Sequence, residues 1–162
     1  MTPPDEPTPA PSPPRKVGVL MGSPNDRDKM QPVADTLADF GLVADIRVMS
    51  AHRAPAKVAE FAQGARDAGF AAVICGAGMA AHLAGAVAAN TTLPVVGIPL
   101  SSGALNGVDA LYSTVQMPPG IPVATVAIGG AVNAALLVVQ MLAITDRELD
   151  AKLRADRERR SG

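Results

Sequence analysis

The stretch around residue 52 sets one of the two histidines of the chain beside a hydroxyl and an arginine, in the order Ser50-Ala51-His52-Arg53. Histidine has an ordinary pKa of about 6.5, so its ring can both accept and donate a proton near neutral pH. Arginine is suited to binding phosphate or carboxylate groups. The pattern therefore indicates a site that holds an anionic substrate and moves a proton, with a solvated turn as the alternative.

Two other loops carry comparable residue types. Residues 22–26 combine a glycine with the hydroxyl of Ser23 and the carboxylate of Asp26 just before a predicted helix, an arrangement suited to binding phosphate. The same residues could form an ordinary N-cap turn with Ser23 or Asp26 as the cap. Residues 76–83 offer glycines and the second histidine, His82, although a lone histidine entering an alanine-rich helix is also compatible with a structural role.

Apolar runs alternate with helical patterns along the chain and predict an α/β protein. The predicted strands are residues 17–21, 44–49, 71–75, 95–100 and 123–128. The predicted helices are residues 28–40, 55–68, 108–114, 131–144 and an alanine-rich helix that ends near residue 90. This alternation predicts a parallel sheet covered by helices on both faces. Because such sheets bind ligands outside the carboxyl ends of their strands, we expect the three loops to meet there.

The composition argues against several kinds of partner. A formal net charge of -1 without a basic block and an aromatic content of 2% do not suit nucleic-acid binding. The single cysteine, Cys75, lies in an apolar run, which fits a buried thiol in a reducing cytoplasm. Residues 70–89 and 121–144 are long enough to span a bilayer. Glycines divide each into a strand and a helix, so we expect no membrane insertion.

The chain divides into three predicted parts. Residues 1–14 contain seven prolines and are predicted to be a disordered tail. Residues 15–145 are predicted to form one catalytic domain, and residues 146–162 a charged C-terminal helix or tail in which Leu149 and Leu153 contact something. The helix at residues 131–144 is apolar around nearly its whole circumference, whereas a surface helix normally has a polar face. We therefore expect another subunit to bury its outer side.

The three loops, taken together and in this order, resemble the PurE family, the N5-carboxyaminoimidazole ribonucleotide mutases of purine biosynthesis. The resemblance rests on Gly22-Ser23-x-x-Asp26, on Ser50-Ala51-His52-Arg53 and on Gly76-Ala77-Gly78-x-Ala80-Ala81-His82-Leu83. It continues in the stretches 105–109, 115–118, 120–123 and 133–137, and so covers roughly residues 15 to 150. As a set these motifs are highly specific.

This resemblance implies a flavodoxin-like three-layer α/β/α sandwich with a five-stranded parallel sheet, and an enzyme that moves a carboxylate from N5 to C4 of an aminoimidazole ribonucleotide without metal or cofactor. It implies that His52 is the general acid and base, while His82 orients the loop or the carboxylate. The family's phosphate and ribose contacts fall on Ser23, Asp26 and Arg53. The remaining expected substrate-binding residues are Gly22, Ser50, Ala51, Gly78, Met79 and Leu83. Family members are octamers with sites at subunit boundaries.

The sequence departs from the usual family pattern in several places. Met79 stands where the family usually has glycine, Ala84 replaces a common proline, and Pro24-Asn25 replaces the usual pair between Ser23 and Asp26. After Gly129 the chain is two residues shorter than many bacterial relatives. Met79 adds bulk beside the expected CO2 pocket, at a position where glycine would tolerate a positive φ better.

Two other functions remain as alternatives. The first is a direct carboxylase that joins free CO2 to aminoimidazole ribonucleotide, as a second branch of the same family does. The second is a non-enzymatic flavodoxin-like module that binds a nucleotide or a partner. The chain lacks the aromatic residues that would flank a flavin and an acidic cluster of the receiver type. The combination of the second and third loops favours the mutase.

Overall fold

The computed structural model describes residues 15–162, so the predicted disordered tail at residues 1–14 lies outside the described residues. The strands are β1 (Lys16–Met21), β2 (Val43–Val48), β3 (Phe70–Gly78), β4 (Val95–Leu100) and β5 (Ala124–Thr125). The helices are the short 3-10 helix η1 (Pro24–Asp26), α1 (Arg27–Asp39), α2 (Pro55–Gly64), α3 (Leu83–Ala88), α4 (Val108–Val115), α5 (Ala131–Ala143) and α6 (Arg147–Ser161).

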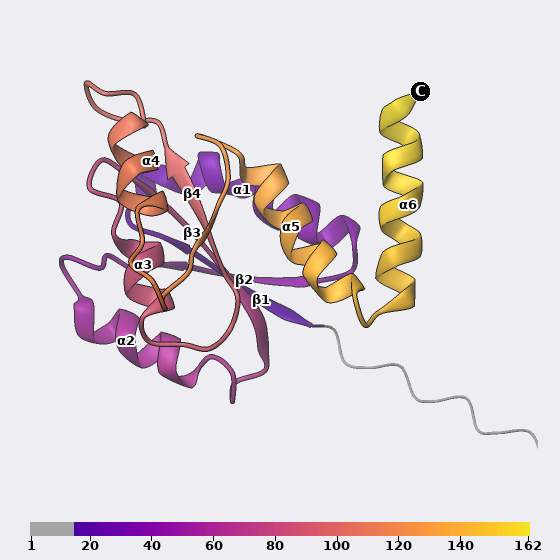
Figure 1. Ribbon diagram of the computed structural model, residues 1–162, viewed down its shortest axis with the longest axis horizontal. Helices are drawn as coiled ribbons and strands as arrows, with labels where there is room; N and C mark the ends of the chain where they lie inside the picture. The colour runs from indigo at the N-terminus through magenta and orange to yellow at the C-terminus, as the bar shows by residue number, and fades with distance from the viewer. Residues whose placement is uncertain (1–14) are drawn as a thin grey trace, which may run out of the picture.

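The five strands form one parallel sheet in the order β2-β1-β3-β4-β5. Parallel neighbours need crossover connections, and the intervening helices supply them. Helices α1 and α5 cover one face of the sheet, and α2 and α3 cover the other (Figure 1). This arrangement is the flavodoxin-like three-layer sandwich expected from the sequence.

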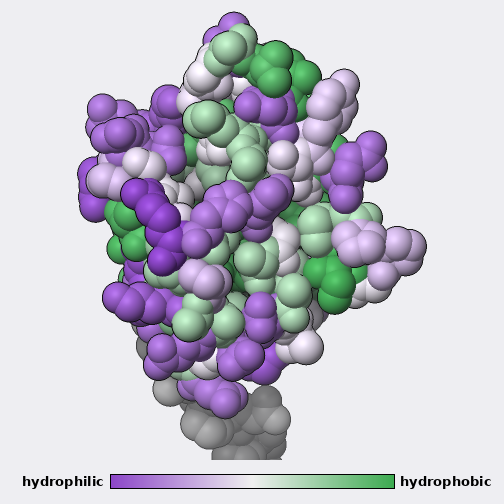
Figure 2. Space-filling view, turned by 90° about the vertical axis from the view of Figure 1, so that its left-hand side faces the viewer, coloured by the Kyte–Doolittle hydropathy of each residue, from purple (hydrophilic) through white to green (hydrophobic). Residues whose placement is uncertain are grey.

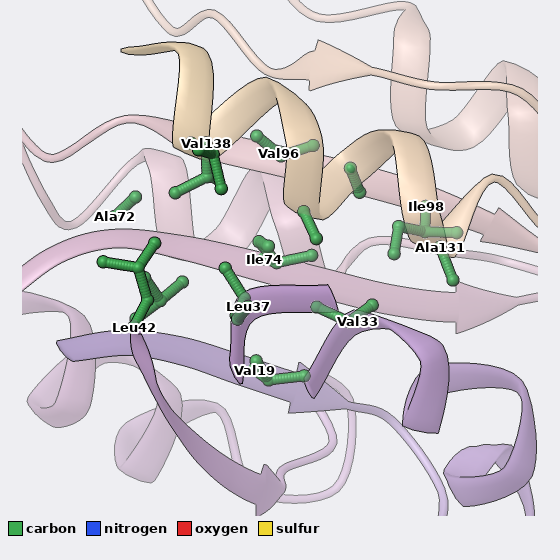
Figure 3. Close-up of a cluster of buried hydrophobic side chains, with 14 of the residues drawn as sticks. Val19, Val33, Leu37, Leu42, Ala72, Ile74, Val96, Ile98, Ala131 and Val138 are labelled. Atoms are coloured by element: carbon green, nitrogen blue, oxygen red, sulfur yellow. The ribbon is translucent and has the colours of Figure 1, made fainter. Parts of the chain in front are cut away.

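The core beneath α1 and α5 joins these helices to alternate residues of the central strands. Val19 and Ile74 point from the sheet toward Val33 and Leu37 of α1 and toward Val138 of α5 (Figure 3). All five side chains are fully buried. The side chains of a strand alternate between the two faces of a sheet, so the neighbours of Val19 and Ile74 serve the opposite layer.

The core on the other face packs α2 and α3 against the sheet. Leu20 and Cys75 point into this layer, where they meet Phe61 of α2 and Leu83 of α3. Burial raises the pKa of the Cys75 thiol, so the thiol is kept neutral. Cys75 is therefore the buried structural thiol that its apolar surroundings predict.

Strand β5 is shorter than the predicted strand at residues 123–128. The backbone N–H of Val126 still donates to the carbonyl of Gly97, and that of Gly129 to the carbonyl of Pro99. Three residues of this segment therefore pass two residues of β4, and the extra residue breaks the regular ladder. The strand ends at Thr125, although the chain stays beside β4 as far as Gly129.

Part of the outer side of α5 is covered by this chain's own helix α6. Leu149 and Leu153 of α6 are buried in the same core cluster as α5, against partly buried residues that include Leu136 and Leu137. The expectation that another subunit covers this side is therefore wrong for the part under α6, because the charged C-terminal helix has an apolar side. Within residues 15–162, no helix combines the length and the apolar character needed to cross a membrane.

Candidate active site

A cavity of about 610 Å³ lies at the carboxyl ends of β1, β2, β3 and β4, where a parallel α/β sheet of this kind binds ligands. It is lined by every site residue expected from the sequence, namely Gly22, Ser23, Asp26, Ser50, Ala51, His52, Arg53, Gly78, Met79, His82 and Leu83. Figure 2 faces the side on which the loop between β2 and α2 lies in Figure 1, and it shows hydrophilic residues interleaved with hydrophobic ones.

The two histidines lie in direct contact across this cavity. Nε2 of His52 is 2.7 Å from Nδ1 of His82, and the two rings meet edge to face with centroids 4.9 Å apart. His52 belongs to the turn after β2, and His82 immediately precedes α3. Because one proton lies between the two nitrogens, one ring donates while the other accepts. The arrangement couples the proton positions of the two rings.

Arg53 is held beside the first loop by two contacts. Its backbone N–H donates to Oγ of Ser50 at 3.2 Å, which fixes the turn. Its guanidinium donates to the backbone carbonyl of Gly22, also at 3.2 Å. A guanidinium carries five N–H donors, so this contact leaves others with which to bind an anion in the cavity.

The first loop serves as a cap and also lines the cavity. Oγ of Ser23 accepts a hydrogen bond from the backbone N–H of Asn25 at 3.2 Å, so that Ser23 caps η1 as the capping interpretation predicts. Asp26 follows at the N-cap of α1 without a capping bond from its side chain. Burial raises the pKa of the Asp26 carboxyl. Two smaller effects lower this pKa: the positive charge of Lys29 and a hydrogen bond from the backbone of Ser23.

The glycines of the third loop make room for neighbouring side chains. A Cβ on Gly76 would collide with the side chain of Met30, and one on Gly78 would collide with that of Ser102. Met79 has a φ of 54° and is 59% exposed. The positive φ expected at this position is therefore present, and methionine adopts it at an energetic cost that glycine would avoid.

Sequence reasoning missed three polar residues that line the cavity, Asn25, Lys29 and Ser102. Lys29 lies in the first turn of α1, and its Nζ donates to the backbone carbonyl of Ser101 at 2.7 Å. Ser102 follows β4 directly after Ser101. The end of β4 was a usable signal for Ser102, because loops that follow neighbouring parallel strands meet at the same edge of the sheet.

The assembled groups suit proton transfer on an anionic molecule. The cavity wall carries the cations of Arg53 and Lys29, the carboxyl group of Asp26 and a hydrogen-bonded histidine pair. Among residues 15–162 there is no cluster of three or more His, Cys, Asp or Glu side chains that could hold a metal ion.

Comparison with known proteins links this chain to a family. The family described as AIR carboxylase matches residues 16–161. An N5-carboxyaminoimidazole ribonucleotide mutase from Pyrococcus abyssi is 51% identical over 143 residues, which are 88% of this chain and 82% of that protein. A mutase of the same name from Mycobacterium tuberculosis is 51% identical over 152 residues, which are 94% of this chain and 87% of that protein.

A solved structure gives an independent comparison of the fold. The crystal structure of Treponema denticola PurE superimposes with a TM-score of 0.82 and is 28% identical in sequence. The match covers 90% of this chain and 91% of that one. The likeness therefore extends over nearly the whole described sandwich.

Proposed function

The chain belongs to the AIR carboxylase family, and from that premise we propose that it is an N5-carboxyaminoimidazole ribonucleotide mutase whose site is the cavity around His52 and His82. The activity places the enzyme in purine biosynthesis as an isomerase. Its support is the shared name of relatives from an archaeon and a bacterium, both 51% identical over more than four fifths of this chain.

The reaction moves a carboxylate from N5 to C4 of the aminoimidazole ring. N5 gains a proton while its bond to the carboxylate carbon breaks, and CO2 is released inside the cavity. The electron pair at C4 then forms the new bond to CO2. Removal of the C4 proton restores the aromatic ring, so one proton is given, one is taken back, and the sum is an isomerisation.

The contact between His52 and His82 is the observation that carries this proposal. The reaction needs one group that first donates and then accepts a proton, and His52 has that capacity. The hydrogen bond from or to His82 at 2.7 Å orients the His52 ring at the cavity wall. We assign the proton transfers to His52 and the orienting role to His82.

The other cavity residues are assigned to binding. Ser23, Asp26 and Arg53 contact the phosphate and ribose, and Gly22 and Ser50 hold Arg53 in place. A further set is assigned to the carboxylate and CO2: Ala51, Gly78, Met79 and Leu83. No cofactor is needed for these steps.

We also propose a homo-octamer with sites at subunit boundaries. Exposed apolar side chains on and just before α4 support an interface, because they recur at helical spacing: Leu105, Val108, Tyr112 and Val115. Light scattering should give eight times the mass of the chain.

We further propose a cytoplasmic location, which the free buried thiol of Cys75 supports. We also propose that residues 15–145 form the catalytic domain and that residues 146–162 form a supporting helix.

The decisive experiment offers two substrates to one preparation. Purified protein is incubated with N5-carboxyaminoimidazole ribonucleotide, and separately with aminoimidazole ribonucleotide plus CO2. The proposal expects rapid formation of the 4-carboxy product from the first substrate. Conversion no faster than in buffer would exclude the mutase, and efficient use of free CO2 alone would establish the direct carboxylase instead.

A further inference from the structure

Lys29 connects helix α1 to a loop that is distant in sequence. Its Nζ donates to the carbonyl of Ser101 at 2.7 Å across a separation of 72 residues. Helix α1 comes after β1 and η1 and the loop follows β4, and β1 and β4 are separated in the sheet by β3. One side chain therefore links two segments across the end of the strand that lies between them.

The segment at residues 101–103 also packs against the third loop. The space that a Cβ on Gly78 would need is filled by the side chain of Ser102, and a Cβ on Gly103 would lie 3.6 Å from Cγ of Met79. Ser102 and Met79 both line the cavity. The position of this segment consequently determines the shape of one cavity wall.

Residues 101–107 belong to no helix or strand, so side-chain contacts contribute much of what fixes their position. A hydrogen bond from an ammonium group is stronger than a neutral one. Lys29 also follows Asp26 by three residues, and its charge lowers the pKa of that carboxyl against the larger effect of burial. The ammonium group thus interacts with both the first loop, through Asp26, and the segment at residues 101–103, through Ser101.

We propose that Lys29 is a positioning residue, whose ammonium group holds residues 101–103 against Gly78 and Met79 and thereby sets the cavity wall. Lys29 acts through Ser101 rather than on the reacting atoms. Its loss should therefore loosen the wall and weaken substrate binding more than it slows turnover. The kinetic part of this inference rests on the proposed function, whereas the position of the loop does not.

The test compares Lys29→Met, Lys29→Arg and a control, Lys57→Met, which changes an exposed lysine of α2 that does not line the cavity. Hydrogen exchange followed by mass spectrometry reports on residues 101–107 without any need for activity. Steady-state kinetics with N5-carboxyaminoimidazole ribonucleotide give KM and kcat for the same preparations. Exchange elsewhere in the sheet shows whether each variant is folded.

For Lys29→Met we expect faster exchange confined to the 101–107 region and a KM raised by about tenfold, with kcat within about twofold, as for a lost charge-assisted hydrogen bond. For Lys29→Arg, exchange in residues 101–107 and KM should both stay close to the wild-type values. Lys57→Met should match the wild type in both. An increased KM with unchanged exchange would mean that Lys29 contacts substrate directly, which overturns the positioning role. Unchanged exchange and KM would overturn it as well. A wild-type protein without mutase activity would refute the proposed function, while the exchange data would still decide the role of Lys29.

Discussion

Nε2 of His52 lies 2.7 Å from Nδ1 of His82, although the two residues are 30 positions apart in the sequence. A hydrogen bond between two imidazole nitrogens requires one protonated and one unprotonated nitrogen. A proton gained or lost at His52 therefore changes which nitrogens of the pair can donate. Replacing either histidine therefore removes a hydrogen-bond partner of the other.

This relationship predicts unequal effects of replacing the two histidines. His52→Asn removes the proton carrier and should lower kcat by about 10²–10⁴-fold, the usual contribution of general acid–base catalysis. Substrate binding should be largely kept, because the phosphate contacts assigned to Arg53 remain. His82→Asn removes only an orienting hydrogen bond and should lower kcat by about tenfold at most.

Single-turnover rates and equilibrium binding of substrate separate these effects. Equal losses of kcat in both variants would show that His82 itself transfers a proton. Full activity of His52→Asn would refute the assignment and favour a non-enzymatic binding module.

We expect the charged carboxylate of Asp26 to destabilise the folded protein, although it contributes to substrate binding. Burial raises the pKa of its carboxyl above the ordinary value of 3.8, so the charged form is less favourable in the folded than in the unfolded protein. Asp26→Asn should therefore raise the urea midpoint at pH 7 and weaken substrate binding. Below the ordinary pKa the Asp26 carboxyl is protonated in both the folded and the unfolded protein. The gain in stability from Asp26→Asn should therefore disappear as the pH falls through the raised pKa toward about 3.

Asp28→Asn is the matched control for this prediction. Asp28 is exposed in the first turn of α1, where a carboxylate is favoured by the helix dipole. Its replacement should lower the midpoint slightly at pH 7. A lower midpoint for Asp26→Asn as well would show that the carboxylate of Asp26 stabilises the fold.

The sequence predicts the sandwich because five apolar runs alternate with helical patterns, and it predicts the loops of the site because each follows a strand. It does not predict the contact between His52 and His82, because that contact depends on how β2 and β3 flank β1 in the sheet. The sequence does not predict the contact of Lys29 with Ser101 for a similar reason. Its partner is a backbone carbonyl after β4, and a carbonyl has no signature in a sequence.

The early end of β5 and the covering of α5 were also beyond sequence reasoning. The extra residue between Val126 and Gly129 interrupts the ladder only in relation to Gly97 and Pro99 of the neighbouring strand. Charged residues dominate the sequence of α6, and its apolar contacts come from a narrow side that includes Leu149 and Leu153. Both features arise from pairing between distant segments rather than from local patterns.

The contribution of α6 to the core can be measured at Leu153. This side chain is 8% exposed and packs into the cluster that contains α5, so Leu153→Ala should lower the free energy of unfolding by about 2 kcal/mol, the lower end of the usual range for such a truncation. Ile144→Ala, at an 83% exposed position between α5 and α6, should change it by less than about 0.5 kcal/mol. Urea denaturation measures both, and equal small changes would show that α6 is not docked on α5.

Met79 gives a prediction in which a substitution at the site stabilises the protein. Its φ of 54° costs a non-glycine residue about 1–2 kcal/mol, while a glycine there would lose about 0.5–1 kcal/mol more conformational entropy on folding. Met79→Gly should therefore raise the free energy of unfolding by about 0.5–1 kcal/mol, measured by urea denaturation. Met79→Ala keeps the backbone strain and should give no gain, which separates the effect of φ from that of the side chain. A loss of stability in Met79→Gly would mean that the packing of the Met79 side chain outweighs the backbone strain.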